Sequence, residues 1–446
     1  MTLPPHADSI AYVRSLGKPT AADVLRRSRE NGKVAVQPRC GVGGHDEMLA
    51  LLRDLEAEAE PDILTITIDS HTRLKRFDNA LRSLNLNPAD LNGYPLVTHG
   101  WQRGRELNSS VRAPIEIRHG SPDARILFDV SVASGITSFE GGGISYNLPY
   151  SKAVPLAESL AAWRDVDAVA GELARDGLVI DRELFGTLTA VLVPPSISLA
   201  IGVLEAISAA QQGVRCISIS YPQSGHLFQD VAALRAIPRL AARYLPAEVE
   251  VFGVLHEFMG VFPKGKRNAE ELIFYGAMAA RLGGAAKIIT KTYHEAYGIP
   301  TTQANVDGMR LAAVANSRLL DFVSIDTSRV DEELDWILEE VGEIIEPVLA
   351  ESNLDSAIIG AFDAGRLDIP FSASKYARSD IIPRREPGGA IRYHSAGALP
   401  LSRQTLRRNR NRLELSTPDD LAVLMSGLND DINYFLRLFG EEAPTT

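Results

Sequence analysis

The sequence predicts an α/β fold, an eight-stranded parallel (β/α) TIM-type barrel with a C-terminal appended α+β segment. Two observations lead to this prediction. From about Lys33 onward, short runs rich in β-branched residues alternate with amphipathic stretches long enough for helices, the pattern of repeated βα units. Eight such runs can be counted, and eight βα units close a barrel. Order alone leaves a doubly wound open sheet as the alternative.

Each predicted strand is followed by a polar or glycine-rich break. The eight runs are residues 33–38, 62–68, 113–118, 135–140, 188–193, 215–220, 248–256 and 285–290. Between them, the run 45–60 places Met48 and Leu52 on one helical face and charges on the other. The run 269–284 ends in a glycine pair that suits a helix stop.

The alternation of strand and helix patterns becomes less regular beyond roughly Asp321. This change, with the stretch that precedes the first strand, predicts three regions. Residues 1–30 are expected to form a helical lead-in, 31–325 the barrel that binds substrate, and 326–446 an extension that packs on the barrel. Within the extension, 331–351 reads as an acidic helix with one apolar docking face. Residues 371–397 read as a loop, dense in Pro, Gly and basic residues, that closes over part of the barrel.

The composition excludes several classes of protein. The 446-residue chain has a net charge of −11, so nucleic acid is not an expected partner. No apolar stretch is long enough to span a membrane, and the N-terminus lacks the build of a signal peptide. Cys40 and Cys216, the only cysteines, form neither a disulfide framework nor a zinc motif. A cytoplasmic location is therefore expected.

Charged side chains stand where four predicted strands end, which is where a barrel of this kind assembles its site. Arg39 and Arg73 follow the first two strands, and Arg118 and Glu140 end the third and the fourth. Because the planar guanidinium group binds carboxylates with two hydrogen bonds, three arginines indicate a substrate with more than one carboxylate, and Glu140 can hold an ammonium group. An amino-dicarboxylic acid fits, although any one of these arginines alone is more often a surface residue.

Two further segments belong to the same predicted edge of the barrel. Glu140 opens "EGGGISYNLPY", where three glycines allow a ligand to approach the backbone, or form a tight turn, and Tyr146 and Tyr150 offer hydroxyl groups. After the eighth strand, Lys291 and Glu295 form either a ribose or acid–base site or an ordinary helical ion pair. The histidines are scattered singly, so no metal site is predicted.

The same residues give the chain a close resemblance to the glutamate mutase epsilon subunit family, also called methylaspartate mutase large subunits. The resemblance extends over nearly the whole chain. It rests on "VQPRCGVG", "TIDSHTRLKRF", "LNGYP", "RHGSPDARIL", "SFEGGGISYNLPYSK", "KTYHEAYGIPT" and "DIPFSASKYARSDIIPRR". Together these motifs are far more specific than any one of them.

The resemblance implies an isomerase that interconverts L-glutamate and L-threo-3-methylaspartate by a radical carbon-skeleton rearrangement dependent on adenosylcobalamin. It implies substrate contacts from Arg39, Arg73, Arg118, Glu140, Tyr146 and Tyr150, with Glu140 also catalytic. It implies cofactor contacts from Gly41, Asn92, Pro149, Lys291, Glu295 and Ile299. The family's residue type is retained at Arg39, Arg73, Arg118, Glu140, Tyr146, Tyr150, Gly41, Asn92, Lys291 and Glu295.

The resemblance also implies a partner. In the family a small, sigma-type cobalamin-binding subunit carries a DxHxxG motif and supplies the cobalt ligand, in a heterotetramer of two large and two small chains. The nearest string here, "DSHTRL", lacks the glycine, so the cobalt ligand is expected from another chain. Two alternatives stay open at this point: the same radical chemistry on a related dicarboxylate, and a non-catalytic barrel that binds dicarboxylates.

Overall fold

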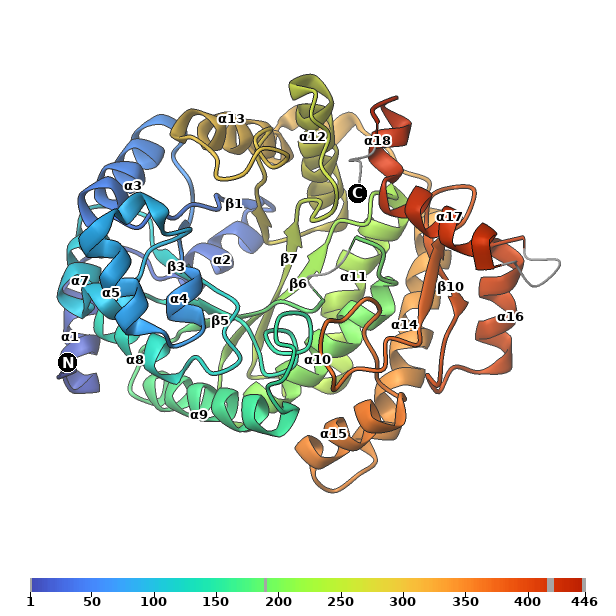
Figure 1. The fold of residues 1–446 in the computed structure, drawn as a ribbon, viewed down its shortest axis with the longest axis horizontal. Coiled ribbons are helices and arrows are strands. Elements are labelled where there is room, and N and C mark those ends of the chain that lie inside the picture. The colour runs from blue at the N-terminus through green and yellow to red at the C-terminus, as the bar shows by residue number, and fades with distance from the viewer. Residues whose placement is uncertain (1, 188–190, 415–420, 443–446) are drawn as a thin grey trace.

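The computed structural model describes residues 2–187, 191–414 and 421–442, and its central feature is a ring of eight parallel strands (Figure 1). The hydrogen-bonded order is β1-β8-β7-β6-β5-β4-β3-β2. The strands are β1 (Ala35–Gln37), β2 (Leu64–Thr67), β3 (Ile115–Arg118), β4 (Ser138–Glu140), β5 (Asp181–Leu184), β6 (Cys216–Pro222), β7 (Glu250–His256) and β8 (Lys287–Ile289). Seven lie within or overlap the predicted runs, and the predicted barrel is confirmed.

The prediction of the fifth strand at 188–193 was wrong. The strand is Asp181–Leu184, and residues 191–193 form a turn that leads into the next helix, while 188–190 lie outside the described residues. The true strand reads "DREL" and carries three charges, whereas the chosen run is apolar. A charged strand is tolerated here because every one of its side chains is buried against partners.

The ring closes between its first and second strands by backbone hydrogen bonds outside the regular ladder. The N–H of Asp62 donates to the carbonyl of Val36 at 3.0 Å, and that of Thr67 donates to Cys40 at 2.8 Å. Because all the strands are parallel, their C-terminal ends open on one side, called the barrel mouth below.

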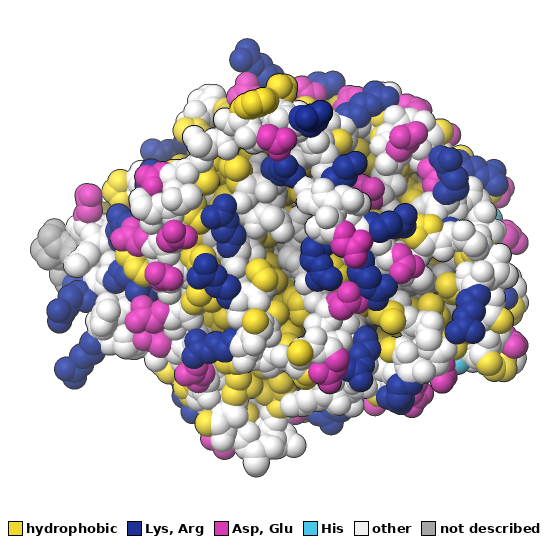
Figure 2. All heavy atoms as spheres, turned by 180° about the vertical axis from the view of Figure 1, so that it is seen from behind, with side chains coloured by type: hydrophobic (Ala, Val, Ile, Leu, Met, Phe, Trp, Pro, Cys, Tyr) yellow, Lys and Arg dark blue, Asp and Glu magenta, His cyan; other side chains and the backbone are white. Residues whose placement is uncertain are grey.

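The opposite end of the barrel is plugged by α2 (Ala21–Glu30). Thr20 starts this helix with a capping box to Asp23, and the buried apolar side of the helix includes Leu25. Its partners are residues at the beginnings of strands, Ala35, Ile63, Cys216, Phe252 and Ala286. Figure 2 shows the face opposite to the view of Figure 1, where acidic and basic side chains are interspersed around a more apolar middle.

Helices surround the strands (Figure 1). In the barrel region they are α1 (His6–Ser15), α3 (His45–Ala59), α4 (Ser70–Arg73), α5 (Phe77–Leu86), η1 (Pro88–Asp90), α6 (Leu96–His99), α7 (Trp101–Ser109), α8 (Arg125–Ala133), α9 (Leu156–Arg175), α10 (Pro195–Gln211), α11 (Leu227–Tyr244), α12 (Lys266–Gly283), α13 (Thr302–Ala312), η2 (Ala313–Asn316) and η3 (Arg318–Phe322). The predicted helices at 45–60 and 269–284 correspond to α3 and α12. As predicted, α12 ends at a left-handed glycine, Gly284.

The C-terminal part of the chain lies beside the barrel. It contains α14 (Thr327–Leu349), α15 (Leu354–Ala364), α16 (Arg403–Arg412), α17 (Leu421–Ile432), α18 (Tyr434–Leu438) and the antiparallel pair β9 (Ile382–Arg385) and β10 (Ile391–Ser395). The predicted acidic helix is α14, which packs on α10 and α11. No helix among the described residues is both long and apolar enough to cross a membrane.

The prediction of 371–397 as a loop was only partly right. Its first part is irregular and touches the loop after β4, since Ser372 donates to the carbonyl of Leu148 at 2.7 Å. Its second part forms β9 and β10, because Ile382, Ile391 and Tyr393 supply strand-forming residues around the turn.

Candidate functional site

The barrel mouth carries all four charged residues predicted from strand ends. Arg118 and Glu140 are the last residues of β3 and β4. Arg73 is placed by α4, whose first turn is capped by the carboxylate of Asp69, and its Nε donates to the carbonyl of Ile68 at 2.8 Å. That bond turns the Arg73 side chain back toward the end of β2.

Arg118 and Glu140 form a buried ion pair at the base of the mouth. A guanidinium nitrogen lies 2.5 Å from Glu140 Oε1, and the side chains are 5% and 1% exposed. The hydroxyl of Tyr146 donates to the other oxygen of Glu140. Burial above all, opposed by the charge of Arg118 and assisted by the carboxylates of Glu183 and Glu116, raises the pKa of Glu140 to about 8.

Beneath this pair, the barrel interior holds a network of charges. Lys287 Nζ lies 2.6 Å from Glu116 and 2.5 Å from Glu183. Arg118 contacts the same two carboxylates at 3.2 and 3.4 Å. The negative charges are therefore shared between two cations, which allows them to remain buried.

His256 extends the network on β7. Its Nε2 lies 2.8 Å from Glu183 and 3.2 Å from the hydroxyl of Ser220. Burial and the neighbouring Arg118 lower the pKa of His256 to about 3, so the imidazole is neutral at physiological pH. It acts as a hydrogen-bonding group here, not as a cation.

Glu140, Glu183 and His256 place ligand-type atoms within 4.8 Å of one another, as a metal site would. The guanidinium of Arg118 already stands among them, in contact with both carboxylates. A second cation would have to displace it. The cluster is therefore better described as the group of side chains that binds the Arg118 guanidinium than as a metal centre.

The three glycines after Glu140 pack against protein groups. A Cβ at Gly141, where φ is +115°, would lie 2.3 Å from the Tyr146 ring, and one at Gly142 would lie 2.3 Å from the carboxyl of Glu205. Glu205 accepts hydrogen bonds from the next two backbone N–H groups, Ile144 and Ser145, both at 2.8 Å. The glycines thus make a tight turn that seats Tyr146, which was the alternative to a ligand cradle.

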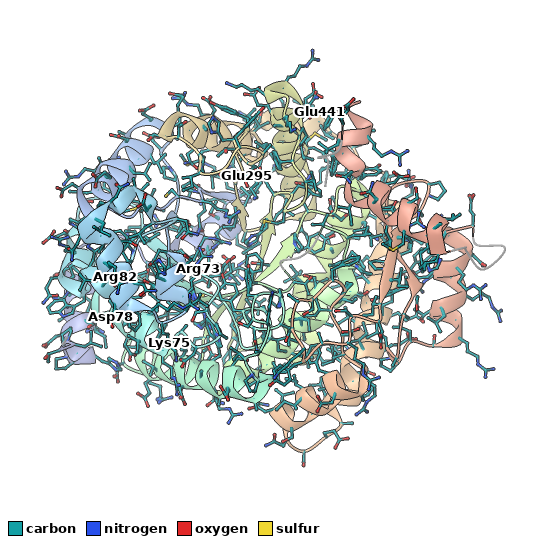
Figure 3. All side chains as sticks on the ribbon, viewed as in Figure 1. Arg73, Lys75, Asp78, Arg82, Glu295 and Glu441 are labelled. Atoms are coloured by element: carbon teal, nitrogen blue, oxygen red, sulfur yellow. The ribbon has the colours of Figure 1, made fainter. Side chains whose placement is uncertain are left out.

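A cavity of about 300 Å³ lies at the mouth and joins residues from both ends of the barrel sequence. Six of its lining residues were predicted from the sequence: Arg39, Gly41, Arg73, Asn92, Glu295 and Ile299. In Figure 3, Arg73 and Glu295 lie toward the middle of the barrel, whereas Asp78 and Arg82 lie on α5 at its outer wall.

Tyr150 lies against Tyr146, the tyrosine that is bonded to the buried pair. It stacks edge-on against Tyr146, with ring centroids 5.6 Å apart, and 43% of its surface is exposed. Desolvation and the charge of Glu140 raise the pKa of its phenol, while Arg39, Arg73 and Arg118 all act to lower it. The charges of all three predicted arginines thus act on this one phenol, and Pro149 precedes Tyr150 in the chain.

Lys291 and Glu295 form an ion pair of 2.5 Å after β8. The backbone N–H of Lys291 donates to the buried carboxyl of Glu257 at 2.5 Å, which fixes the start of this segment. Burial lowers the pKa of Lys291 to about 8, against the charge of Glu295 and with the help of Arg39. The pair therefore belongs to the same electrostatic neighbourhood as the arginines.

Sequence reasoning missed the interior carboxylates and Lys287. Glu183 was missed because the fifth strand was misplaced. Glu116 and Lys287 lay within correctly predicted strands, and their signal was available: each is a charged residue flanked by apolar ones within a short strand. A charge in such a place points into a polar barrel interior.

The chain is similar to one family of proteins over nearly its whole length. The family model described as methylaspartate mutase E chain (MutE) matches residues 18–432. The glutamate mutase epsilon subunit of Desulfitobacterium hafniense is 40% identical over 417 residues, covering 91% of this chain and 86% of that protein. The protein of the same name from Halobacterium salinarum is 41% identical over 414 residues, covering 92% and 86%.

Proposed function

The chain belongs to the methylaspartate mutase E chain family, and from this premise we propose that it is the large subunit of an adenosylcobalamin-dependent glutamate mutase. The reaction would interconvert L-glutamate and L-threo-3-methylaspartate by radical carbon-skeleton rearrangement. One observation supports the proposal beyond the family name. Arg39 and Arg73 line a cavity at the mouth, and the buried pair of Arg118 and Glu140 lies at the strand ends there, with Tyr146 bonded to Glu140 and Tyr150 against Tyr146.

Arg39 and Arg73 are the groups proposed to bind the substrate carboxylates directly. Both line the cavity, and neither forms an ion pair, taken as an N···O distance of at most 4.0 Å, with any described residue. Their positive charge is thus available to a ligand. Arg118 already touches three carboxylates, and these contacts fix its position from below. It is proposed to bind the substrate from that fixed position.

Glu140 is proposed to hold the substrate ammonium group and to take part in proton transfer. Its raised pKa keeps it near the working pH, where a carboxyl group can both accept and donate a proton. The hydroxyl of Tyr146 fixes one carboxylate oxygen, and Arg118 fixes the other. The group is therefore oriented before substrate arrives.

The residues proposed to contact the cofactor fit its adenosyl part. The cavity beside Asn92 and Glu295 is open to the mouth, and the Lys291–Glu295 pair offers both donors and an acceptor for ribose hydroxyl groups. When bound, adenosylcobalamin supplies an organic radical that starts the rearrangement. This chain's part is to orient the substrate, to hold the ribose and to exclude water.

A small cobalamin-binding subunit is proposed as the partner, docked over the mouth in a two-plus-two heterotetramer. Large apolar side chains are exposed in segments that follow the strands: Leu74, Ile126, Tyr150, Tyr297 and Ile299. Exposed residues of this kind at the entrance of a site suit an interface. The cobalt ligand would come from the partner's DxHxxG motif.

The test is a reconstitution. The purified chain is combined with its small subunit, adenosylcobalamin and L-glutamate, and methylaspartate and the paramagnetic signal of a cob(II)alamin-coupled radical are measured. Both are expected. A folded, assembled complex that shows neither would overturn the proposal, and a panel of related 2-oxo and 2-hydroxy dicarboxylates in the same assay identifies a different substrate.

A further inference from the structure

Arg182, on the missed strand β5, is one of the largest fully buried side chains of the protein. It points away from the interior charge network, toward α9, where its Nε donates to Asp167 at 2.8 Å. Asp167 is itself 5% exposed. The cation is thus neutralised within the core, so its burial does not leave an unpaired charge.

The other nitrogens of Arg182 bind the backbone on both sides of Glu140. Nη1 donates to the carbonyl of Phe139 at 2.5 Å, and Nη2 donates to the carbonyl of Gly141 at 2.8 Å. These are the residues immediately before and after Glu140. The planar guanidinium therefore binds the backbone at the end of β4, where the chain turns at Gly141 with a positive φ.

Arg182 also supports Glu140 through a stack of rings. Its guanidinium carbon lies 4.8 Å from the centroid of the Trp163 ring, which stacks on His119 with centroids 5.6 Å apart. His119 in turn meets the Tyr146 ring edge-on at 4.8 Å. Tyr146 is the residue that donates its hydroxyl hydrogen to Glu140.

We propose that Arg182, held by Asp167, is a positioning residue that fixes the Glu140 carboxylate between Arg118 and Tyr146. It acts through the two flanking carbonyls and through the ring stack, and it touches no substrate. This inference rests on the proposed function for its catalytic meaning. A purely structural arginine would only stabilise the fold, whereas this one sets the position of the carboxylate.

The experiment compares Arg182→Lys and Asp167→Asn with a matched control, Arg392→Lys. Arg392 is equally a buried arginine, paired with Glu333 and Glu386, but it lies on β10 in the C-terminal part. The pKa of the Glu140 carboxyl is measured by infrared titration of each folded variant, with Glu140→Gln identifying the band. The kcat and KM for L-glutamate are then measured in the reconstituted complex.

Lysine can reach only one carbonyl, so Arg182→Lys is expected to raise the pKa of Glu140 by about one unit, as the carboxyl withdraws from Arg118. The kcat is expected to fall about tenfold or more, with a smaller change in KM. Asp167→Asn is expected to show the same changes in smaller size. Arg392→Lys is expected to change thermal stability alone.

The proposal is overturned if Arg182→Lys leaves the Glu140 titration where the wild type has it, or lowers it, whatever activity the variant keeps. It is also overturned if Arg182→Lys loses no more activity than Arg392→Lys. The infrared measurement needs neither cofactor nor substrate. A wild-type chain without mutase activity would therefore contradict the proposed function, while the titration would still decide the role of Arg182.

Discussion

The carboxylate of Glu140 lies 2.5 Å from the guanidinium of Arg118, and both side chains are buried beneath the cavity that Arg39 and Arg73 line. The pair joins the ends of two neighbouring strands, β3 and β4. A substrate in the mouth would thus meet two free guanidinium groups above and one paired guanidinium below. This layered arrangement suits a molecule with a carboxylate at each end and an ammonium group between.

Replacing Glu140 by Gln is expected to reduce kcat/KM for L-glutamate by about 100-fold or more, because a positioned acid or base contributes about 10²–10⁴. If the ammonium group is its partner, turnover of amino acids should fall far more than turnover of oxo acids. Steady-state rates on both substrate types measure this. Equal losses would contradict the ammonium contact, and Glu106→Gln on the exposed side of α7 is the control.

Arg73→Lys is expected to raise KM for glutamate by about tenfold or more, because an ammonium group cannot reproduce the two parallel hydrogen bonds of a guanidinium. Isothermal titration of glutamate into the protein checks the change in affinity. Arg76→Lys is the matched control, since Arg76 lies three residues later, is exposed and is absent from the cavity lining. Equal effects of the two variants would place the Arg73 side chain outside the substrate site.

Particular residues show how far sequence reasoning reached. Arg39, Arg73, Arg118 and Glu140 were predicted at one edge because parallel strands end together, and the structure brings them to one mouth. Glu183 was not predicted, because strands were identified by runs of apolar residues. The segment "DREL" contains only one apolar residue. Only the partners supplied by other strands, Lys287 above all, make such a strand stable.

Glu205 predicts a pH dependence of stability. Burial raises its folded-state pKa to about 7, against the hydrogen bonds from Ser145 and Ile144, so between its unfolded value of 4.5 and 7 the folded chain binds more protons than the unfolded chain. This contribution to stability is complete below the lower value and is lost as the pH rises through the higher one. The loss amounts to about 3 kcal/mol.

Glu205→Gln should abolish that part of the pH dependence, because its amide oxygen still accepts from Ile144 and Ser145 but has no proton to lose. Denaturant unfolding at pH 5 and pH 7 measures the difference. Glu340→Gln, a buried carboxylate on α14, controls for the general effect of the substitution. A variant with the same slope as the wild type would show that Glu205 does not titrate in this range.

Gly141→Ala is expected to destabilise the protein by about 1–3 kcal/mol from its positive φ alone, and by more because the new methyl group meets the Tyr146 ring. Activity should fall as well, since Tyr146 holds Glu140. Gly17→Ala is the control, because Gly17 also has a positive φ but no atom near the added Cβ. If both variants lose the same stability, the contact with Tyr146 carries no energetic weight.

Lys291 predicts how the affinity for adenosylcobalamin depends on pH. Burial lowers its pKa to about 8, so its charge is present below that pH and is lost as the pH rises through it. If the charged amine of Lys291 and its ion-pair partner Glu295 together contact the ribose, the affinity for adenosylcobalamin should fall above pH 8. Lys291→Arg should move this fall beyond pH 10, because the guanidinium group stays protonated there.

Titration of the assembled complex with the cofactor at pH 6 to 10 gives the measurement. Lys152→Arg serves as the control, since Lys152 is an exposed lysine of the loop after β4 and should leave the profile unchanged. A wild-type affinity that stays level across pH 8 would show that the charge of Lys291 makes no contribution. A fall that Lys291→Arg does not shift would assign the titration to another group, for which Glu140 is the first candidate because its pKa lies in the same range.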